Sequence, residues 1–480
     1  GTFIGMLPGL GPISAIALMI PITYGFDPAA GMILMAGVYY GAVFGGSTSS
    51  ILINAPGIAG TVATAFDGYP MAQRGEAGKA LAIAAYSSFA GGTIGAILLL
   101  AAAPALAAVA LSFQSADYFA LMVLGLTAVS AFAARGQFLK AMMMTVVGLM
   151  LATVGQDVSS DTYRFTFGQV DLLDGFSFLM IAMATFALSE ALMVVLRRQM
   201  VAPQALAATK GHMGSLALSK SEVRQMVPAI ARASPFGFLI GVLPGAGATI
   251  ASFLAYGMER NVARGEAKAQ FGKGSIRGLS APETANNAAS TGSFVPLLTL
   301  GIPGSGTTAV MLGALLSFGI QPGPSLFQDR PEVFWSVILS MYLGNIILLI
   351  LNLPLIPYIA RLLTLPRQIL VPLILFFSLI GVYLVSFNTF DIQAMVAFAA
   401  FALVFRLMDY PMAPLILAFV LGRLMEENLR RALLINDGSI SFLWERPICL
   451  GITIVTLIVL AVPVFDWWRQ RHVVTAGEGG

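Results

Sequence analysis

Long apolar stretches follow one another along almost the whole chain, separated by short polar segments. Many of them hold the roughly 20 apolar residues that a helix needs to cross a bilayer, and they lack the strict alternation of half-buried strands. Others are interrupted, as where the apolar stretches 283–300 and 303–320 follow each other closely. The pattern predicts an all-α, polytopic membrane protein with about a dozen spans, some of them broken.

Composition strengthens this prediction. Of the 480 residues, 58% are hydrophobic and 10% are charged, whereas soluble domains carry roughly 25% charged residues. These values exclude a soluble enzyme, a nucleic-acid-binding module and a disordered chain. The single cysteine, Cys449, excludes an intrachain disulfide, and the only histidines are His212 and His472, which argues against a zinc or haem protein. The chain has no phosphate-binding G-x-x-x-x-G-K-[ST] motif, and we expect no cofactor.

Loop charges predict the orientation of the chain. Segment 197–233 carries six basic residues against one acidic residue, a net charge of +5, and segment 258–278 has a net charge of +3. Segment 156–174 has a net charge of −3. The positive-inside rule places the first two segments in the cytoplasm and the third outside. Trp467 and Trp468 indicate an interfacial anchor before a cytoplasmic tail.

These observations divide the chain into four parts. We expect a first membrane repeat at 1–198, a polar cytoplasmic linker with an amphipathic segment at 199–234, a second membrane repeat at 235–466 and a C-terminal tail at 467–480. The chain opens within an apolar stretch and without an initiator methionine, so we expect the natural N-terminus to lie upstream.

The two membrane halves carry related sequence. The string GTFIGMLPGLG at 1–11 matches GFLIGVLPGAG at 237–247 in seven of eleven positions, at a constant offset of 236. Further along, NAPG at 54–57 aligns with GIPG at 301–304, at an offset of 247. The longer charged loop at 258–278 accounts for the difference between the offsets. We therefore predict two structural repeats of opposite membrane orientation.

Each repeat contains two Pro-Gly breaks in apolar sequence. Proline removes a backbone donor and glycine favours leaving the helix. Unpaired backbone groups survive in a membrane only where they are buried in protein or line a wet cavity. There, helix N-termini attract anions and exposed carbonyls attract cations, which is typical of a secondary transporter's binding site. We predict that 54–57 and 301–304 form non-helical, re-entrant hairpin tips that meet near the middle of the membrane.

An acid and two amides stand out in the second half. Glu283, Asn286 and Asn287 lie within about one helical turn, and oxygen groups of this kind suit a hard cation or a proton. A simple N-terminal helix cap explains the acid equally well.

Other charged residues have structural interpretations. Glu190, an acid embedded in apolar sequence, is also a candidate functional residue, and Lys140 or an arginine is its alternative structural partner. Asp67, followed by Gly, Tyr and Pro, predicts a turn. Glu426 and Arg430 predict an i,i+4 pair on a solvated helix end.

Several motifs together resemble a known family. They are GMLPGLGP at 5–12, YYGAVFGGS at 39–47, NAPG at 54–57, AFDGYP at 65–70, PETANNAA at 282–289, LGIPGS at 300–305 and GIQPGP at 319–324. In this order they resemble the signatures of the TctA family, the large membrane subunit of tripartite tricarboxylate transporters, over essentially the whole chain. Thr284 departs from the serine that is commoner in that motif.

The resemblance implies a multi-pass secondary transporter of the bacterial inner membrane. It implies uptake of citrate or a related carboxylate by symport with Na⁺ or H⁺, in an elevator-type fold with two inverted repeats. It also implies two partners, a small four-span membrane subunit and a periplasmic solute-binding protein that delivers the carboxylate.

The expected binding site follows from the resemblance and from electrostatics. Neither Pro-Gly break contains lysine or arginine, so backbone N–H groups, hydroxyls and a co-transported cation, expected near Asn54 and Asn287, must balance a polyanion. The expected substrate-binding residues are Ser47, Thr48, Ser49, Ser50, Asn54, Pro56, Gly57, Pro303, Gly304, Ser305, Thr307 and Thr308. The expected ion-binding or coupling residues are Gly9, Gly11, Gly245, Gly247, Glu283, Asn286 and Asn287.

An intramembrane enzyme acting on lipid or peptide is the alternative function. The sequence offers it no His-containing metal motif, no G-x-S-x-G elbow and no Asp-rich diphosphate site. A channel is a third interpretation, but repeated broken helices suit alternating access better than a fixed pore.

Overall fold

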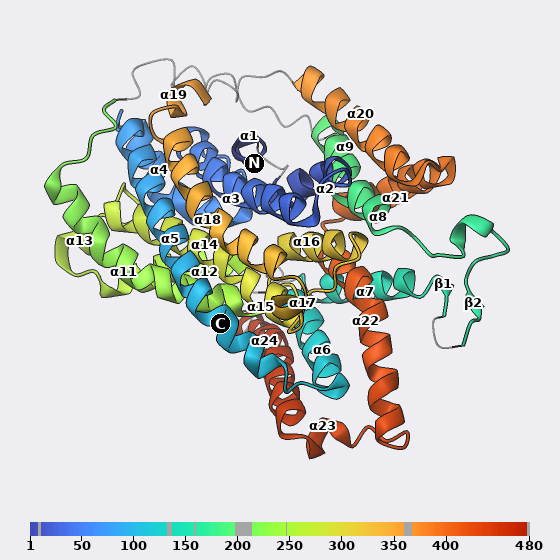
Figure 1. Ribbon diagram of the computed structural model, residues 1–480. Helices are drawn as coiled ribbons and strands as arrows, with labels where there is room; N and C mark the ends of the chain where they lie inside the picture. Colours follow the sequence, from blue (N-terminus) through green and yellow to red (C-terminus); the bar gives the residue numbers. More distant parts are fainter. Residues whose placement is uncertain are drawn as a thin grey trace.

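The fold is known from a computed structural model, which describes residues 1–7, 11–131, 137–157, 160–196, 214–245, 247–359 and 367–477. Within these ranges helices dominate, as the apolar stretches predict (Figure 1). One pair of antiparallel strands, β1 (Gly155–Gln156) and β2 (Tyr163–Arg164), interrupts them.

The helices of the first half end before the segment that connects the two halves. They are α1 (Thr2–Met6), α2 (Gly11–Thr23), α3 (Pro28–Ile53), η1 (Ala59–Thr61), α4 (Val62–Gln73), α5 (Ala77–Ala110), α6 (Ser115–Ala131), α7 (Phe138–Ala152), η2 (Val170–Leu172), α8 (Phe178–Ala182), the π-helix η3 (Met183–Leu188) and α9 (Ser189–Leu196).

The second half begins with a long helix that crosses position 234, the expected end of the linker. Its helices are α11 (Lys220–Val242), α12 (Gly247–Val262), α13 (Gly265–Ala269), α14 (Ile276–Gly292), α15 (Phe294–Leu300), α16 (Gly306–Ser317), α17 (Leu326–Asp329), α18 (Pro331–Asn352), α19 (Ile356–Ile359), α20 (Arg367–Ser386), α21 (Thr389–Leu407), α22 (Ala413–Ile435), α23 (Phe442–Glu445) and α24 (Pro447–Gly477).

Side-chain caps explain where several helices begin. Asp27 accepts a hydrogen bond from the Ala29 N–H at the start of α3 (2.9 Å), and Pro28 occupies the first helical position, where a missing N–H costs nothing. At the start of α11, Ser219 and Glu222 form a reciprocal capping box. Ser275 caps α14 in the same way as Asp27 caps α3. Short polar residues between apolar stretches therefore set the helix boundaries.

The helices pack as two bundles that share two helices (Figure 1). The first bundle contains α1, α3–α5, α11–α15 and α18, with α14 packed against α4, α5, α11 and α12. The second bundle contains α6–α9, η3 and α20–α24. Helices α2 and α16 contact both bundles.

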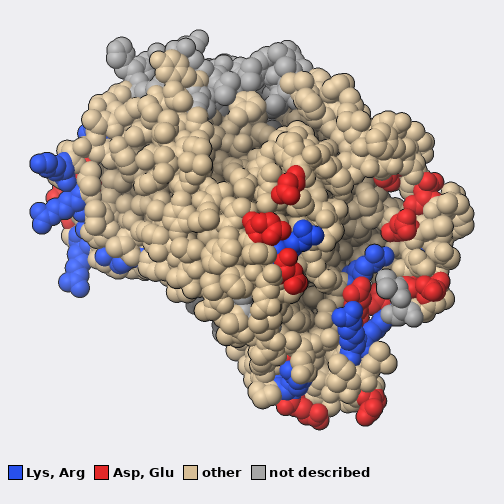
Figure 2. All heavy atoms as spheres, in the orientation of Figure 1, with Lys and Arg blue, Asp and Glu red and all other residues tan. Residues whose placement is uncertain are grey.

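The outer surface is suited to lipid. Five helices in the described ranges are long and apolar enough to cross a membrane, and six shorter apolar helices accompany them. On α18, Leu339, Leu343, Ile346 and Ile350 form one exposed apolar stripe, which would be unfavourable in water. Figure 2 shows basic side chains at the edge over α11 and α13, with a wide uncharged area beside them. The structure is that of a multi-pass membrane protein; the count of about a dozen spans stays a prediction.

The two halves share backbone geometry where their sequences match. Helices α1 and α11 both end in an extended leucine, Leu7 (φ −81°, ψ 114°) and Leu243 (φ −74°, ψ 124°). The next helices begin with glycines of left-handed conformation, Gly11 (φ +52°) and Gly247 (φ +58°). Residues 8–10, with Pro8, lie outside the described residues, so these flanking residues carry the comparison.

The two halves also share contacts. Gly5 of α1 lies against the backbone of Ala42 in α3, and Gly241 of α11 lies against the backbone of Ala289 in α14. These pairs differ by the offsets 236 and 247 that the sequence predicts. Matching backbone contacts at two independent offsets agree with a structural repeat, whereas the opposite membrane orientation of the repeats stays a prediction.

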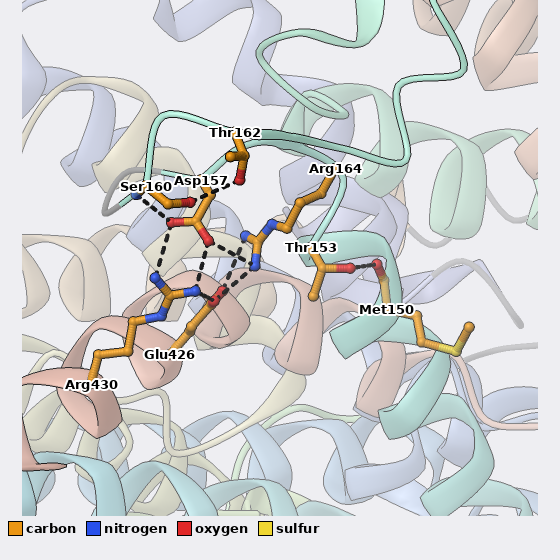
Figure 3. Close-up of polar contacts among 8 residues, drawn as sticks. All are labelled: Met150, Thr153, Asp157, Ser160, Thr162, Arg164, Glu426 and Arg430. Atoms are coloured by element: carbon orange, nitrogen blue, oxygen red, sulfur yellow. Dashed lines mark hydrogen bonds and ion pairs between the residues drawn. The ribbon is translucent and has the colours of Figure 1, made fainter. Parts of the chain in front are cut away.

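A network of charges fixes the β1–β2 loop to α22 (Figure 3). Arg430 donates to both carboxylate oxygens of Asp157 at 3.0 and 2.7 Å, and Arg164 donates to both oxygens of Glu426 at 2.8 and 3.2 Å. The predicted i,i+4 pair between Glu426 and Arg430 is confirmed at 2.6 Å. Asp157, directly after β1, and Arg164 of β2 therefore anchor the two strands to α22.

Asp67 does not form the predicted turn. It lies inside α4, and its Oδ1 accepts the backbone N–H groups of Gly272, Gly274 and Ser275 at 2.9, 2.8 and 2.7 Å. The turn prediction was wrong because local propensity is weaker than this tertiary contact, in which a loop of the second half wraps a carboxylate of the first.

Candidate functional site

The two Pro-Gly breaks at 54–57 and 301–304 are non-helical, as predicted. We call Asn54–Ile58 the first tip and Gly301–Ser305 the second tip. Each tip begins with a left-handed residue directly after a helix, Asn54 (φ 50°, ψ 32°) after α3 and Gly301 (φ 67°, ψ 25°) after α15. The N–H groups of these two residues bond the carbonyls of Ser49 and Pro296, which correspond at the offset of 247.

Each tip also packs against the end of the preceding broken helix. Gly57 of the first tip lies against Gly5 and Gly46, and Gly304 of the second tip lies against Gly241 and Ser293. All three pairs of equivalent residues follow the two offsets. The repeated sequence thus builds the same local structure twice.

Both tips line one cavity of about 730 Å³ where the two bundles meet. Pro56 and Gly57 of the first tip and Ser305 of the second tip belong to its wall, together with Gly245 and the first turns of α2 and α12. A cavity of this size accommodates a small organic molecule.

Helix N-termini converge on this cavity. Its lining includes first-turn residues of α2, α12, α16, α22 and of η1, which runs directly into α4. Each helix start has N–H groups without an intrahelical acceptor and a partial positive charge of about half an elementary charge. Backbone groups from five separate helices therefore favour an anion in the cavity.

One wall of the cavity carries an ion pair that the sequence analysis did not place there. Arg406 of α21 pairs with Glu190 of α9, and within the described residues these are the charged side chains that line the cavity. Glu190 thus pairs with an arginine, as expected, whereas Lys140 donates to the carbonyl of Met408 at 2.7 Å. The signal available in the sequence was an isolated arginine inside the apolar stretch 390–408, but no pattern linked it to the Pro-Gly breaks.

A second polar cluster is buried in the first bundle, away from the large cavity. The carboxylate of Glu283 accepts hydrogen bonds from Ser47 at 2.7 Å, from Ser88 at 2.8 Å and from Thr64. Glu283 has no exposed surface, and no ion pair to it is found among the residues that the structure describes. Four helices, α3, α4, α5 and α14, thus enclose an acid surrounded by hydroxyls.

The amides expected near this acid connect it to η1, which directly follows the first tip. The Asn287 side chain donates to the Glu283 carbonyl at 2.9 Å and to Asn286 Oδ1 at 2.6 Å. The Asn286 side chain donates to the carbonyl of Gly60, a residue of the large cavity's wall, at 3.3 Å. The buried cluster and the cavity therefore share a hydrogen-bonded boundary.

A very small cavity adjoins the cluster. It measures about 10 Å³, close to the volume that one water molecule occupies, and its wall includes Ser47, Thr48, Ser88 and Asn352. The Asn352 Oδ1 atom is buried, and the residues that the structure describes offer it no hydrogen-bond partner. An unsatisfied buried acceptor beside hydroxyls that already serve a carboxylate is a costly arrangement unless a further donor or cation joins it.

The structure separates the expected site residues into three sets. Residues that line the large cavity are Gly11, Pro56, Gly57, Gly245, Gly247, Ser305 and Thr307. Residues of the Glu283 cluster and its small cavity are Ser47, Thr48, Glu283, Asn286 and Asn287. The third set belongs to the tips or to the helices beside them and does not line the cavity: Ser49, Ser50, Asn54, Pro303, Gly304 and Thr308. Gly9 lies outside the described residues.

Fold and site together define a class, a helical multi-pass membrane protein with two repeats whose broken helices face a cavity suited to an anion. The sequence model of the tripartite tricarboxylate transporter TctA family matches residues 1–417, and the chain belongs to this family. It is therefore a subunit of a tricarboxylate transporter, and this membership argues against the intramembrane enzyme. The family supplies the large subunit of tripartite transporters.

Two similar proteins come from Agrobacterium vitis. The "Uncharacterized 52.8 kDa protein in TAR-I ttuC' 3'region" is 44% identical over 472 residues, which cover 98% of this chain and 92% of that protein. The "Uncharacterized protein in TAR-II ttuC' 3'region" is 44% identical over 230 residues, which cover 47% of this chain and 94% of that protein. No solved structure matches this chain.

Proposed function

We propose that this chain carries citrate or a related carboxylate into the cell by symport with Na⁺ or H⁺. The observation that supports this proposal best is the convergence of five helix N-termini on the cavity between the two tips. With about half an elementary charge each, these termini together offer on the order of two positive charges, which suits a di- or tricarboxylate.

The substrate lies, in this proposal, between the two tips. Backbone N–H groups around Gly57 and Gly306 and the hydroxyls of Ser305 and Thr307 are the available donors on the tip side. Hydrogen bonds to a charged acceptor are about twice as strong as neutral ones, so a few well-placed donors hold a carboxylate without a permanent charge on the tips.

The coupling ion binds, in this proposal, at the Glu283 cluster. Glu283, Ser47, Ser88 and Asn352 offer oxygen atoms around the small cavity, and oxygen ligands suit a hard cation such as Na⁺. A cation there would compensate the buried carboxylate and satisfy Asn352 Oδ1, and a proton on Glu283 would do the former.

The hydrogen bond from Asn286 to Gly60 supplies a route for coupling. An ion that orders the Glu283 cluster also favours one position of Gly60 and hence of the first tip. If the ion strengthens carboxylate binding by some factor, the carboxylate must strengthen ion binding by the same factor.

Family membership supports the remaining features of the proposal. The chain lies in the bacterial inner membrane and works with a small four-span membrane subunit and a periplasmic solute-binding protein. The first bundle, which carries the tips, moves against the second bundle in an elevator-type cycle of two inverted repeats. The contacts of α2 and α16 with both bundles are compatible with a sliding interface there.

Reconstitution tests the proposal. The chain, its small membrane subunit and its binding protein are placed in liposomes, and uptake of radiolabelled citrate is measured with a Na⁺ gradient, a pH gradient, both or neither. We expect uptake above the passive leak with at least one gradient. Carboxylate uptake that is insensitive to both gradients would contradict ion coupling, and uptake of no di- or tricarboxylate would contradict the proposed function.

A further inference from the structure

The ion pair between Glu190 and Arg406 is the one charged feature in the described wall of the large cavity. It sits on helices of the second bundle, α9 and α21, whereas the tips belong to the first bundle or its boundary. A ligand held between the tips therefore faces helix N-termini on one side and this ion pair on another.

Arg406 is held in place by an irregular helix. The π-helix η3 exposes the Thr185 carbonyl, which accepts hydrogen bonds from Arg406 Nη2 at 3.0 Å and from the Ser189 hydroxyl at 2.6 Å. The guanidinium also lies 5.7 Å from the ring centroid of Phe186, another cavity residue. π-Helices cost stability and recur at functional sites, so a single π-turn that positions an arginine at a cavity wall points to a binding role.

A purely structural role does not explain why Glu190 lies in the wall of this cavity. A carboxylate in the wall of an anion cavity repels the ligand unless a cation such as Arg406 compensates its charge. A partly buried ion pair adds little net stability compared with apolar residues of the same size. The pair is better explained if Arg406 exchanges one carboxylate partner for another.

We propose that Arg406 is the ligand for the carboxylate that a tricarboxylate has and a dicarboxylate lacks, and that Glu190 is the resident anion with which this carboxylate competes. The inference rests on the proposed function, because it assumes that a carboxylate enters the cavity. Arg406 presents a planar fork that matches a carboxylate in two parallel hydrogen bonds. Glu190 then raises the number of negative charges that a ligand needs to bind, and so favours tricarboxylates over dicarboxylates.

Two ligands that differ by one carboxyl group test this assignment. Tricarballylate and glutarate share a chain of three carbons between their terminal carboxylates, and only tricarballylate has a carboxylate on the middle carbon. Binding of each is measured by equilibrium dialysis with the full-length chain, co-purified with its small membrane subunit in nanodiscs, for the wild type and two variants.

The two variants should move affinity in opposite directions. In Arg406→Gln, tricarballylate should bind at least about 30-fold more weakly and glutarate less than about threefold more weakly, because a charge-assisted, bidentate contact is lost. In Glu190→Gln, tricarballylate should bind about 3- to 10-fold more tightly, because the competing anion is removed. Both variants break the same ion pair, so a merely structural pair predicts weaker binding in both.

Arg232→Gln is the matched control. Arg232 pairs with the buried Glu259 at 2.7 Å between α11 and α12, and neither residue lines the cavity. We expect this variant to bind both ligands as the wild type does. If Arg406→Gln aggregates, Arg406→Lys, which keeps the charge and loses the fork, should still lower the affinity for tricarballylate selectively.

The outcomes separate the inference from the proposed function. If the wild type binds neither ligand nor citrate, the proposed function is wrong. If the wild type binds tricarballylate but Arg406→Gln leaves the ratio of the two affinities unchanged, or both variants weaken binding equally, the assignment of Arg406 is overturned while the function stands.

Discussion

The two tips have the same backbone conformation, but the side chains behind them differ. Asn54 and Gly301 are both left-handed, and both tips rest on the glycine ends of a broken helix, through Gly5 or Gly241. Both contribute to one cavity. The repeat therefore preserves the backbone conformation whose N–H groups bind an anion in the proposed function.

The side chains behind the tips differ completely. At the repeat offset of 247, Glu283 corresponds to Ala36, Ser47 to Phe294 and Thr64 to Met311. Glu283, Ser47 and Thr64 belong to the buried acid–hydroxyl cluster. Their counterparts are fully buried members of an apolar core. Phe294 packs against the rings of Tyr39 and Tyr40 instead of a polar group.

This difference assigns separate roles to symmetry and asymmetry. A duplicated backbone builds a two-sided anion site, and of the two equivalent positions Glu283 and Ala36 only Glu283 carries an ionisable group that can respond to a cation.

Removing the acid of the Glu283 cluster should have the largest effect. In Glu283→Ala we expect gradient-driven citrate uptake to fall by at least about 100-fold, because a cation in a buried site needs a compensating charge. Phe294→Leu, at the apolar position equivalent to Ser47, should retain the gradient dependence. Uptake into proteoliposomes measures both, and gel filtration checks folding. A Glu283→Ala protein that still follows the Na⁺ or pH gradient would refute the coupling role.

Adding one methyl group to each tip should expose a smaller asymmetry. At Gly57 a Cβ atom would overlap the Gly5 carbonyl oxygen, whereas at Gly304 the nearest backbone atoms would lie 3.0 Å away. Because backbone cannot move aside as a side chain can, we expect Gly57→Ala to cost about 3 kcal/mol and Gly304→Ala about 1 kcal/mol. Thermal unfolding in detergent measures the order, and an equal or reversed order contradicts it.

The left-handed position of the first tip distinguishes a backbone role from a side-chain role. Asn54 is exposed and does not line the cavity. We expect Asn54→Gly to retain uptake, and Asn54→Ala to lose about 1 kcal/mol of stability because alanine tolerates φ of 50° poorly. Loss of citrate uptake in Asn54→Gly would instead support the predicted substrate contact of its side chain.

The smallest effect concerns the N-terminal capping box of α11. The much shorter α1 has no side-chain cap in the described chain. The Ser219 backbone N–H and then Lys79 hold the pKa of Glu222 at about 2, below its ordinary 4.5. A depressed pKa stabilises the fold above pH 4.5, and the contribution disappears as pH falls toward 2. Glu222→Gln should therefore cost roughly 0.5–1 kcal/mol at pH 6.

Thermal unfolding of wild type and Glu222→Gln at several pH values checks this. The difference between the two proteins should shrink steadily from pH 5 to pH 3. Lys79→Met, which keeps the length of the side chain, should reproduce part of the loss. A difference that is independent of pH would show that the cap does not depend on the charge of Glu222.

Sequence alone determined the helical membrane class, the two repeats and the position of the tips. These features depend on local chemistry: long apolar stretches must become helices in lipid, and a Pro-Gly pair must leave the helix wherever it stands. The glycine contacts that join Gly5 to Ala42 and Gly241 to Ala289 follow the offsets read from the sequence.

Only the tertiary structure decided which polar residues meet. Ser47 was expected at the substrate but lies against Glu283, 236 positions away, and Arg406 reached the cavity from a helix with no sequence mark of the site. Asp67 lies in a helix rather than in the predicted turn, and three N–H groups of a distant loop donate to its carboxylate. Side-chain partners depend on how helices pack in three dimensions, and in a chain where apolar residues surround every polar one, sequence spacing carries little information about that packing.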